Sequence, residues 1–244
     1  MSILTDLHIA AVGDIHLGEE VRGRYRERLK GIEHRADVLM LAGDLTRHGT
    51  LEECHLVADE FRDLPVPVVA VLGNHDYHSD RQDDMAAALR DAGVTVLDDE
   101  GTVISCGDTK LGVAGGKGFG GGFAGKSASE FGEREIKNFV AHTRAIAESW
   151  KLALKNLQTE RRVVLSHYSP IKETLEGEPL EIYPFLGSYL LAEAVDTIGA
   201  DLFLHGHAHK GTEKGMTPGG IRVRNVALPV LGRAYGMYCL DGVD

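Results

Sequence analysis

The sequence contains few cysteines, few aromatic residues and no long hydrophobic run. Its three cysteines are far apart and form no Cys-x-x-Cys pair, so neither a disulfide framework nor a thiolate zinc site is predicted. No segment approaches the roughly 20 apolar residues that cross a bilayer. The N-terminus also lacks the basic and long apolar regions of a secretory signal. We therefore expect no membrane partner and, by default, a reducing, cytoplasmic location.

Positive charge is also scarce. The chain has 26 Lys and Arg against 37 Asp and Glu, which gives a formal net charge of −11. This excess of negative charge argues against a protein that coats nucleic acid or an anionic membrane. A nucleic acid partner is therefore not expected, and bound divalent cations would offset part of the negative charge. The sequence does not indicate an oligomeric state.

The first third of the chain alternates short apolar runs with helical patterns. The predicted strands are residues 7–12, 38–42 and 66–72, and the predicted helices are residues 25–34, 51–62 and 82–91. This alternation predicts a mainly parallel, buried sheet with right-handed crossovers. In open α/β sheets, functional sites gather at the carboxyl ends of the strands.

The rest of the chain has a different pattern. Apolar runs at residues 102–105 and 110–114 predict a β-hairpin, and a glycine-rich stretch, Gly115–Gly125, follows it. Further helices are predicted at residues 133–157 and 187–198, and further strands at 163–166, 202–204, 221–226 and 235–240. The chain has no internal repeat and no long linker. The simplest interpretation is one α/β domain, residues 1–244, with two sheets.

Polar clusters follow five of the apolar strands. They are Asp14-Ile15-His16, Gly43-Asp44, Gly73-Asn74-His75-Asp76, an isolated His167, and Gly206-His207-Ala208-His209. A single Asp or His at a strand end is more often a turn former or a solvated group than a ligand. The five clusters together, in this order, are hard to produce by chance. The glycines allow sharp turns that direct the following side chains into one pocket.

This set of residues suits a site for two metal ions. Two divalent ions roughly 3.5–4 Å apart need mixed oxygen and imidazole ligands and a bridging carboxylate. Asn74 would supply a neutral oxygen, which limits the negative charge of the site, and His75 would stay free to act as an acid. Mn, Fe, Zn or Co would suit these ligands, and the sequence does not select among them.

The series of motifs resembles that of the calcineurin-like metallophosphoesterases over nearly the whole chain. The resemblance implies a four-layer α/β/β/α sandwich with two central mixed β-sheets. The ligands that it implies for the first metal are Asp14, His16, Asp44 and His209. Those that it implies for the second metal are Asp44, as the bridge, with Asn74, His167 and His207.

The same resemblance implies a mechanism. A metal-bound hydroxide would attack phosphorus in line, and His75 would protonate the leaving alkoxide with Asp76 as its orienting group. The serine/threonine phosphatases of the family carry an Asp-Arg pair just after the Gly-Asp motif. Here Arg47 is shifted and His48 stands in its place, which resembles the small bacterial phosphodiesterases more closely. We therefore expect a small phosphodiester substrate, with cyclic nucleotides as one candidate and with Arg47 and His48 as contacts.

Other interpretations stay open. A phosphomonoesterase or a nuclease could use the same site, although a nuclease would normally add a capping domain or a basic platform. A metal-free protein-binding scaffold is a further alternative, but scaffolds of that kind lose ligands. The segment Gly120–Ser127 matches the phosphate-loop pattern GxxxxGK[ST], yet so glycine-rich a stretch matches several such patterns by composition. A lid beside the metal site is the favoured interpretation of this stretch.

Two further segments each have two interpretations. Basic residues crowd 22–30, where a solvated helix face is favoured over a phosphate-attracting rim. Tyr183-Pro184-Phe185 and Tyr189 lie between the last two motifs, where a substrate pocket and a core position are equally plausible.

Overall fold

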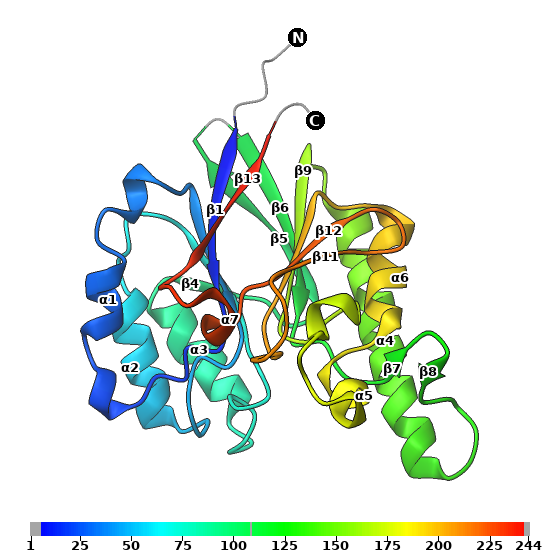
Figure 1. Cartoon of the computed structure of the whole chain (residues 1–244). Coiled ribbons are helices and arrows are strands. Elements are labelled where there is room, and N and C mark those ends of the chain that lie inside the picture. The colour runs from blue at the N-terminus through cyan, green and yellow to red at the C-terminus, as the bar shows by residue number, and fades with distance from the viewer. Residues whose placement is uncertain (1–5, 108, 242–244) are drawn as a thin grey trace.

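Two β-sheets pack face to face, and helices cover the outer face of each (Figure 1). The structure is a computed structural model that describes residues 6–107 and 109–241. The strand orders are β13-β1-β2-β3-β4 in the five-stranded sheet and β11-β12-β10-β9-β6-β5 in the six-stranded sheet. Both sheets are mixed, so the predicted α/β class and four-layer sandwich are confirmed.

The five-stranded sheet contains the strands predicted in the first third of the chain. Its strands are β1 Leu7–Val12, β2 Val38–Ala42, β3 Val68–Val71, β4 Val94–Val96 and β13 Gly236–Leu240. β1 to β4 are parallel, and β13 pairs antiparallel with β1. The helices on its outer face are α1 Arg24–Arg28, α2 Leu51–Phe61 and α3 Gln82–Asp91. The short β4, which lacks a distinct apolar run, was not predicted.

The six-stranded sheet begins with the predicted hairpin, whose turn residue Asp108 lies outside the described residues. Its strands are β5 Glu100–Cys106, β6 Thr109–Gly116, β9 Arg161–Ser166, β10 Leu202–His205, β11 Lys214–Met216 and β12 Arg222–Asn225. The helices α4 Arg134–Asn156 and α6 Tyr189–Ile198 cover its outer face (Figure 1). Trp150 on α4 is fully buried against Phe203 and donates a hydrogen bond to Asp99 Oδ1 at 2.8 Å.

The core between the sheets follows from the alternation of side chains along each strand. In β1, Ala10 and Val12 face the helices, whereas Ile9 and Ala11 face the other sheet. The opposing sheet presents Val113, Val163, Leu165, Leu202 and Leu204 to this inner layer. Because both faces of the central strands are buried, their sequences are continuously apolar, which is why they were predictable.

Short elements lie in the connections between these strands and helices. They are β7 Gly122–Phe123, β8 Lys126–Ser127, α5 Tyr183–Leu186, α7 Leu228–Leu231 and the 3₁₀ turns Glu19–Val21, Ile32–His34, Glu173–Leu175 and Leu180–Ile182. The predicted helix 25–34 is interrupted, because Gly31 has a φ of 74° and cannot continue the helix. Among residues 6–107 and 109–241, no helix has both the length and the apolar composition that crossing a membrane requires.

The glycine-rich stretch does not form the expected lid or a phosphate loop. Residues 120–123 are buried, and Gly121 N–H donates to Pro184 O at 2.7 Å while Gly122 N–H donates to Gly187 O at 2.9 Å. Residues 122–127 form the β7–β8 hairpin, and the next helix begins only at Arg134. A phosphate loop needs a helix directly after its Lys-Ser pair. The stretch instead supports the segment that contains α5.

Candidate metal centre

The five polar motifs meet where the strands of the two sheets end. Ligand atoms of Asp14, His16, Asp44 and His209 lie within 4.8 Å of one another, and so do those of Asp44, His167 and His207. The first group draws on β1, β2 and the loop after β10, and the second draws on β2, β9 and the same loop. Asp44 belongs to both groups. The structure thus brings together six of the seven predicted ligands, and Asn74 joins them through its contact with His167.

The backbone at this site is strained. Asp14, His16, Asp44 and His207 have φ values of 56°, 42°, 49° and 71°. Non-glycine residues are uncommon in this left-handed region, and such strain clusters at functional sites. The left-handed residues end the strands abruptly. Asp14 N–H donates to Gly43 O at 2.9 Å, and His16 N–H donates to Asp44 O at 3.1 Å, so the first two loops lie side by side.

Two glycines allow the motifs to approach this closely. A Cβ atom on Gly73 would lie 2.1 Å from Asp44 Oδ1, and one on Gly206 would lie 2.3 Å from Asp14 Oδ2. Both separations are far below van der Waals contact, so neither position has room for a side chain. The glycines predicted to permit sharp turns therefore also make room for the carboxylates.

Asp14 organises the first group of ligands. Its buried carboxylate accepts a hydrogen bond from His207 N–H at 2.9 Å and one from His209 Nε2 at 2.9 Å. Burial alone would raise the pKa of Asp14, but the hydrogen bond from His209 and the nearby His167 lower it overall. The same hydrogen bond raises the pKa of His209. A cation bound here would replace the proton that His209 shares with Asp14.

The second group presents converging lone pairs. His167 Nδ1 lies 2.9 Å from Ala42 O, which can only accept, so Nδ1 carries a proton and Nε2 is the nitrogen left to bind a metal in the neutral ring. Nε2 lies 2.9 Å from Asn74 Oδ1 and 3.3 Å from Asp44 Oδ1. In the neutral ring with Nδ1 protonated, Nε2 and these two oxygens would present three electron-pair donors to one point. That donor set fits a cation.

His207 is also prepared as a neutral ligand. Its Nε2–H donates to Phe185 O at 3.1 Å, which leaves Nδ1 unprotonated. Burial, together with the neighbouring His167, lowers the pKa of His207 to about 3. Main-chain carbonyls thus select the tautomer of both His167 and His207.

The structure corrects the role expected for Asp76. Its buried carboxylate accepts hydrogen bonds from Thr46 N–H at 2.8 Å, Thr46 Oγ1 at 2.6 Å, Leu45 N–H at 3.2 Å and Gly73 N–H at 2.8 Å. Asp76 therefore joins the loops after β2 and β3. The ring of His75 is oriented instead by Arg47 O, which lies 2.7 Å from Nδ1. His75 Nε2 is 3.9 Å from Asp44 Oδ2, at the border of the metal centre.

Arg47 and His48, the predicted substrate contacts, each contact a glutamate at the rim. Arg47 pairs with Glu20, and His48 Nδ1 lies 2.8 Å from Glu53 Oε1 at the start of α2. The basic segment 22–30 also makes contacts within the protein, since Arg26 donates a hydrogen bond to Arg62 O at 2.6 Å. Arg28 on α1 is exposed. This placement agrees with a solvated helix face.

The sequence did not lead us to predict the cationic side chain of Lys117 beside the metal centre. Lys117, directly after β6, has its ammonium 4.8 Å from the ring centroids of Tyr77 and Phe119 and 5.3 Å from that of Tyr168. Burial lowers its pKa, while Asp99, Asp98 and Asp44 raise it. Its carbonyl accepts hydrogen bonds from His167 N–H and Tyr168 N–H, both at 3.1 Å. Within a glycine-rich stretch, no sequence pattern indicates this environment.

The sequence profile of the calcineurin-like phosphoesterases matches residues 7–211, which include all five motifs. The chain belongs to the calcineurin-like phosphoesterase family. The family is dinuclear and metal-dependent, and its members hydrolyse phosphate esters. In this phosphoesterase, the Asp and His clusters described above could bind metals. No curated protein matches the sequence.

Solved structures share the fold of this phosphoesterase. A phosphopantetheinyl hydrolase from Mycobacterium tuberculosis is 17% identical, with a TM-score of 0.65 over 91% of this chain and 89% of that one. A protein of Thermus thermophilus is 16% identical, with a TM-score of 0.61 over 98% of this chain and 100% of that one. A putative 5′-nucleotidase from Staphylococcus aureus is 14% identical, with a TM-score of 0.58 over 91% of this chain and 48% of that one. At these identities the likeness shows the fold alone.

Proposed function

We propose that this phosphoesterase is a single domain, residues 1–244, that hydrolyses small phosphodiesters with two divalent metal ions. The observation that supports this most directly is Asp44, whose carboxylate belongs to both groups of converging ligand atoms. Asp14, His16 and His209 would complete one metal site, and Asn74, His167 and His207 the other. The mixture of oxygen and imidazole ligands suits Mn, Fe, Zn or Co.

The protein's own residues would divide the chemistry. Two bound ions supply Lewis acidity, which activates water and stabilises negative charge on the phosphoryl oxygens. In its imidazolium form, His75 would keep Nδ1–H bonded to Arg47 O and would donate the proton on Nε2 to the leaving alkoxide. The ring lies 4.5 Å from that of His16, so the donated proton would originate beside the first metal site.

A small diester fits the charge of the protein better than a polynucleotide. The net charge of −11 repels a large polyanion at long range, whereas bound dications would dominate the field inside the pocket. The described cysteines are all unpaired, which suits the reducing, cytoplasmic location that we also propose.

The test is a panel of substrates, each with Mn²⁺: bis-p-nitrophenyl phosphate, p-nitrophenyl phosphate, cyclic nucleotides and single-stranded DNA. We expect the highest kcat/KM for the small diesters and no turnover after chelation of the metal. If single-stranded DNA were the best substrate, the protein would be a nuclease. The absence of metal-dependent turnover of every substrate would favour the scaffold hypothesis.

A further inference from the structure

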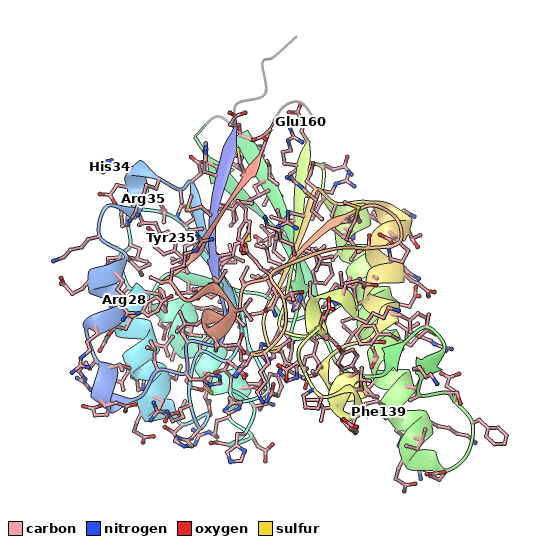
Figure 2. All side chains as sticks on the ribbon, viewed as in Figure 1. Arg28, His34, Arg35, Phe139, Glu160 and Tyr235 are labelled. Carbon is pink, nitrogen blue, oxygen red and sulfur yellow. The ribbon has the colours of Figure 1, made fainter. Side chains whose placement is uncertain are left out.

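Aromatic side chains border the metal centre on the side of the six-stranded sheet. Phe185 on α5 is joined to the site, because its carbonyl oxygen lies 3.1 Å from His207 Nε2. Its ring centroid lies 6.4 Å from that of Phe139 on α4, which lies 5.1 Å from that of Phe119. Figure 2 shows Phe139 beside α5 at the lower end of the molecule. We call Phe119, Phe139 and Phe185 the aromatic wall.

The outer member of the aromatic wall is exposed. Phe185 is 61% exposed, although rings of this size are usually buried. Leu180 and Ile182, earlier in the same connection, are also exposed, at 74% and 37%. An exposed apolar surface beside a polar site typically marks a ligand-binding surface.

The backbone beneath Phe185 is held in place from both sides. Pro184 O accepts the hydrogen bond from Gly121 N–H, and Ser188 N–H donates to Ser169 O at 3.1 Å. A Cβ atom on Gly120 would lie 2.4 Å from Pro184 O, so the glycine-rich stretch packs directly against this turn. The ring is therefore presented on a supported turn rather than on a free loop. Presentation of this kind lowers the entropic cost of binding.

We propose that Phe185 binds a planar aromatic group of the substrate, such as a nucleobase, on the ester group that is not displaced. This inference rests on the proposed phosphodiesterase function. The main chain of Phe185 lies close enough to His207 that a phosphoryl group at the metal centre would place its substituent beside this residue. Rings 4.5–7 Å apart in tilted or edge-on contact are favourable, and Phe139 already holds Phe185 in that geometry, at 75°. An aliphatic chain would gain from burial but not from this geometry.

The experiment compares two substrates with the same leaving group, thymidine 5′-(p-nitrophenyl phosphate) and ethyl p-nitrophenyl phosphate, both with Mn²⁺. The Phe185→Leu variant keeps an apolar side chain and the carbonyl that bonds to His207 but removes the ring. We expect the ratio of kcat/KM, thymidine ester over ethyl ester, to fall roughly 10-fold, mainly through KM, as for the loss of one base-stacking contact. Phe185→Tyr should restore most of the ratio.

The matched control is Phe131→Leu. Phe131 is 86% exposed, and among the described residues no ring contact of its side chain is seen. This control should leave the ratio unchanged, and metal content should be the same in all variants. An unchanged ratio in Phe185→Leu would overturn the aromatic site while leaving the proposed function intact. The same holds if a hexyl ester outperforms the thymidine ester in the wild type. Failure of the wild type to hydrolyse either ester would overturn both.

Discussion

The two sheets supply different groups to the metal centre. The five-stranded sheet supplies both carboxylates, Asp14 and Asp44, and the buried Asp76 joins its loops. The six-stranded sheet supplies only imidazoles, from His167, His207 and His209. The negative charge that would hold two dications therefore comes from one half of the molecule. The other half provides imidazole ligands, and main-chain carbonyls set the tautomers of two of them, His167 and His207.

The two halves also differ beyond the ligands. Three of the four strained ligand residues follow strands of the five-stranded sheet, whereas the aromatic wall lies on the other side. In the proposed reaction, the five-stranded half would hold the metal-bound chemistry, and the six-stranded half would border a substituent of the substrate. We therefore expect that metal binding and substrate choice can be altered separately.

The largest expected effect is on metal content and kcat. It should follow replacement of the carboxylate shared by both metal sites, compared with replacement of an imidazole that belongs to one site. Asp44→Ala should lose both metals and lower kcat roughly 10³-fold, because several kcal/mol of transition-state stabilisation depend on them. His207→Ala should keep the metal held by Asp14, His16 and His209. Metal content by elemental analysis and turnover of bis-p-nitrophenyl phosphate check both, with the exposed Asp59→Ala as the control. Equal metal loss in the two variants would show that the carboxylate of one half and the imidazole of the other contribute equally to metal binding.

A second variant separates catalysis from metal binding within the first half. His75→Ala should keep both metals and lower turnover roughly 10²–10⁴-fold for esters with poor leaving groups, since these need a proton in the transition state. For p-nitrophenyl esters the loss should be much smaller. A leaving-group series for both proteins, with metal analysis, makes this measurement. Equal losses across the series would remove His75 as the acid.

The third prediction concerns how the free energy of unfolding depends on pH through His205, on β10 of the six-stranded sheet. Burial lowers the pKa of His205 to about 4, below the ordinary 6.5, so the unfolded state binds the proton first as pH falls. The stabilisation is present above pH 6.5 and is lost as pH falls toward 4, by roughly 3 kcal/mol at most. His207 acts in the same direction, whereas the raised pKa of His209 acts in the opposite one.

Urea unfolding of the metal-free protein between pH 7.5 and 4.5 would measure this dependence. His205→Gln should flatten the curve relative to the wild type, which isolates this residue from His207 and His209. Asp14, with its lowered pKa, would add a loss only below about pH 4. A His205→Gln curve parallel to the wild type would show that His205 does not contribute.

The smallest effects are expected at the rim. Arg47→Ala and His48→Ala should each change kcat/KM for bis-p-nitrophenyl phosphate less than about threefold, because both are exposed side chains whose polar groups already contact glutamates. Both side chains are already paired, with Glu20 and Glu53. A tenfold or larger rise in KM would instead establish them as substrate contacts and would extend substrate recognition to the first half.

The sequence predicted what local patterns encode. β1 and β2 were placed to the residue, and the motif residues after them lie together as expected, because apolar runs and their polar ends are local signals. Three sets of contacts could not be predicted from the sequence. They are the hydrogen bonds of Asp76, the contact of the Phe185 carbonyl with His207, and the aromatic rings around Lys117. These contacts join residues distant in the chain, and many of them involve main-chain groups that no side-chain pattern reveals. The role of the glycine-rich stretch was not predictable for the same reason, since its hydrogen-bond partners lie some 60 residues away in the chain.

Trp150 gives the second half a built-in optical probe. It is the only tryptophan of the chain, and it lies fully buried where α4 packs on the six-stranded sheet. Tryptophan emission during unfolding would therefore report this interface alone, whereas far-ultraviolet circular dichroism would report the helices of both halves. Coincident curves would mean that the two sheets separate and unfold as one cooperative unit. Separate curves would give each half its own unfolding free energy.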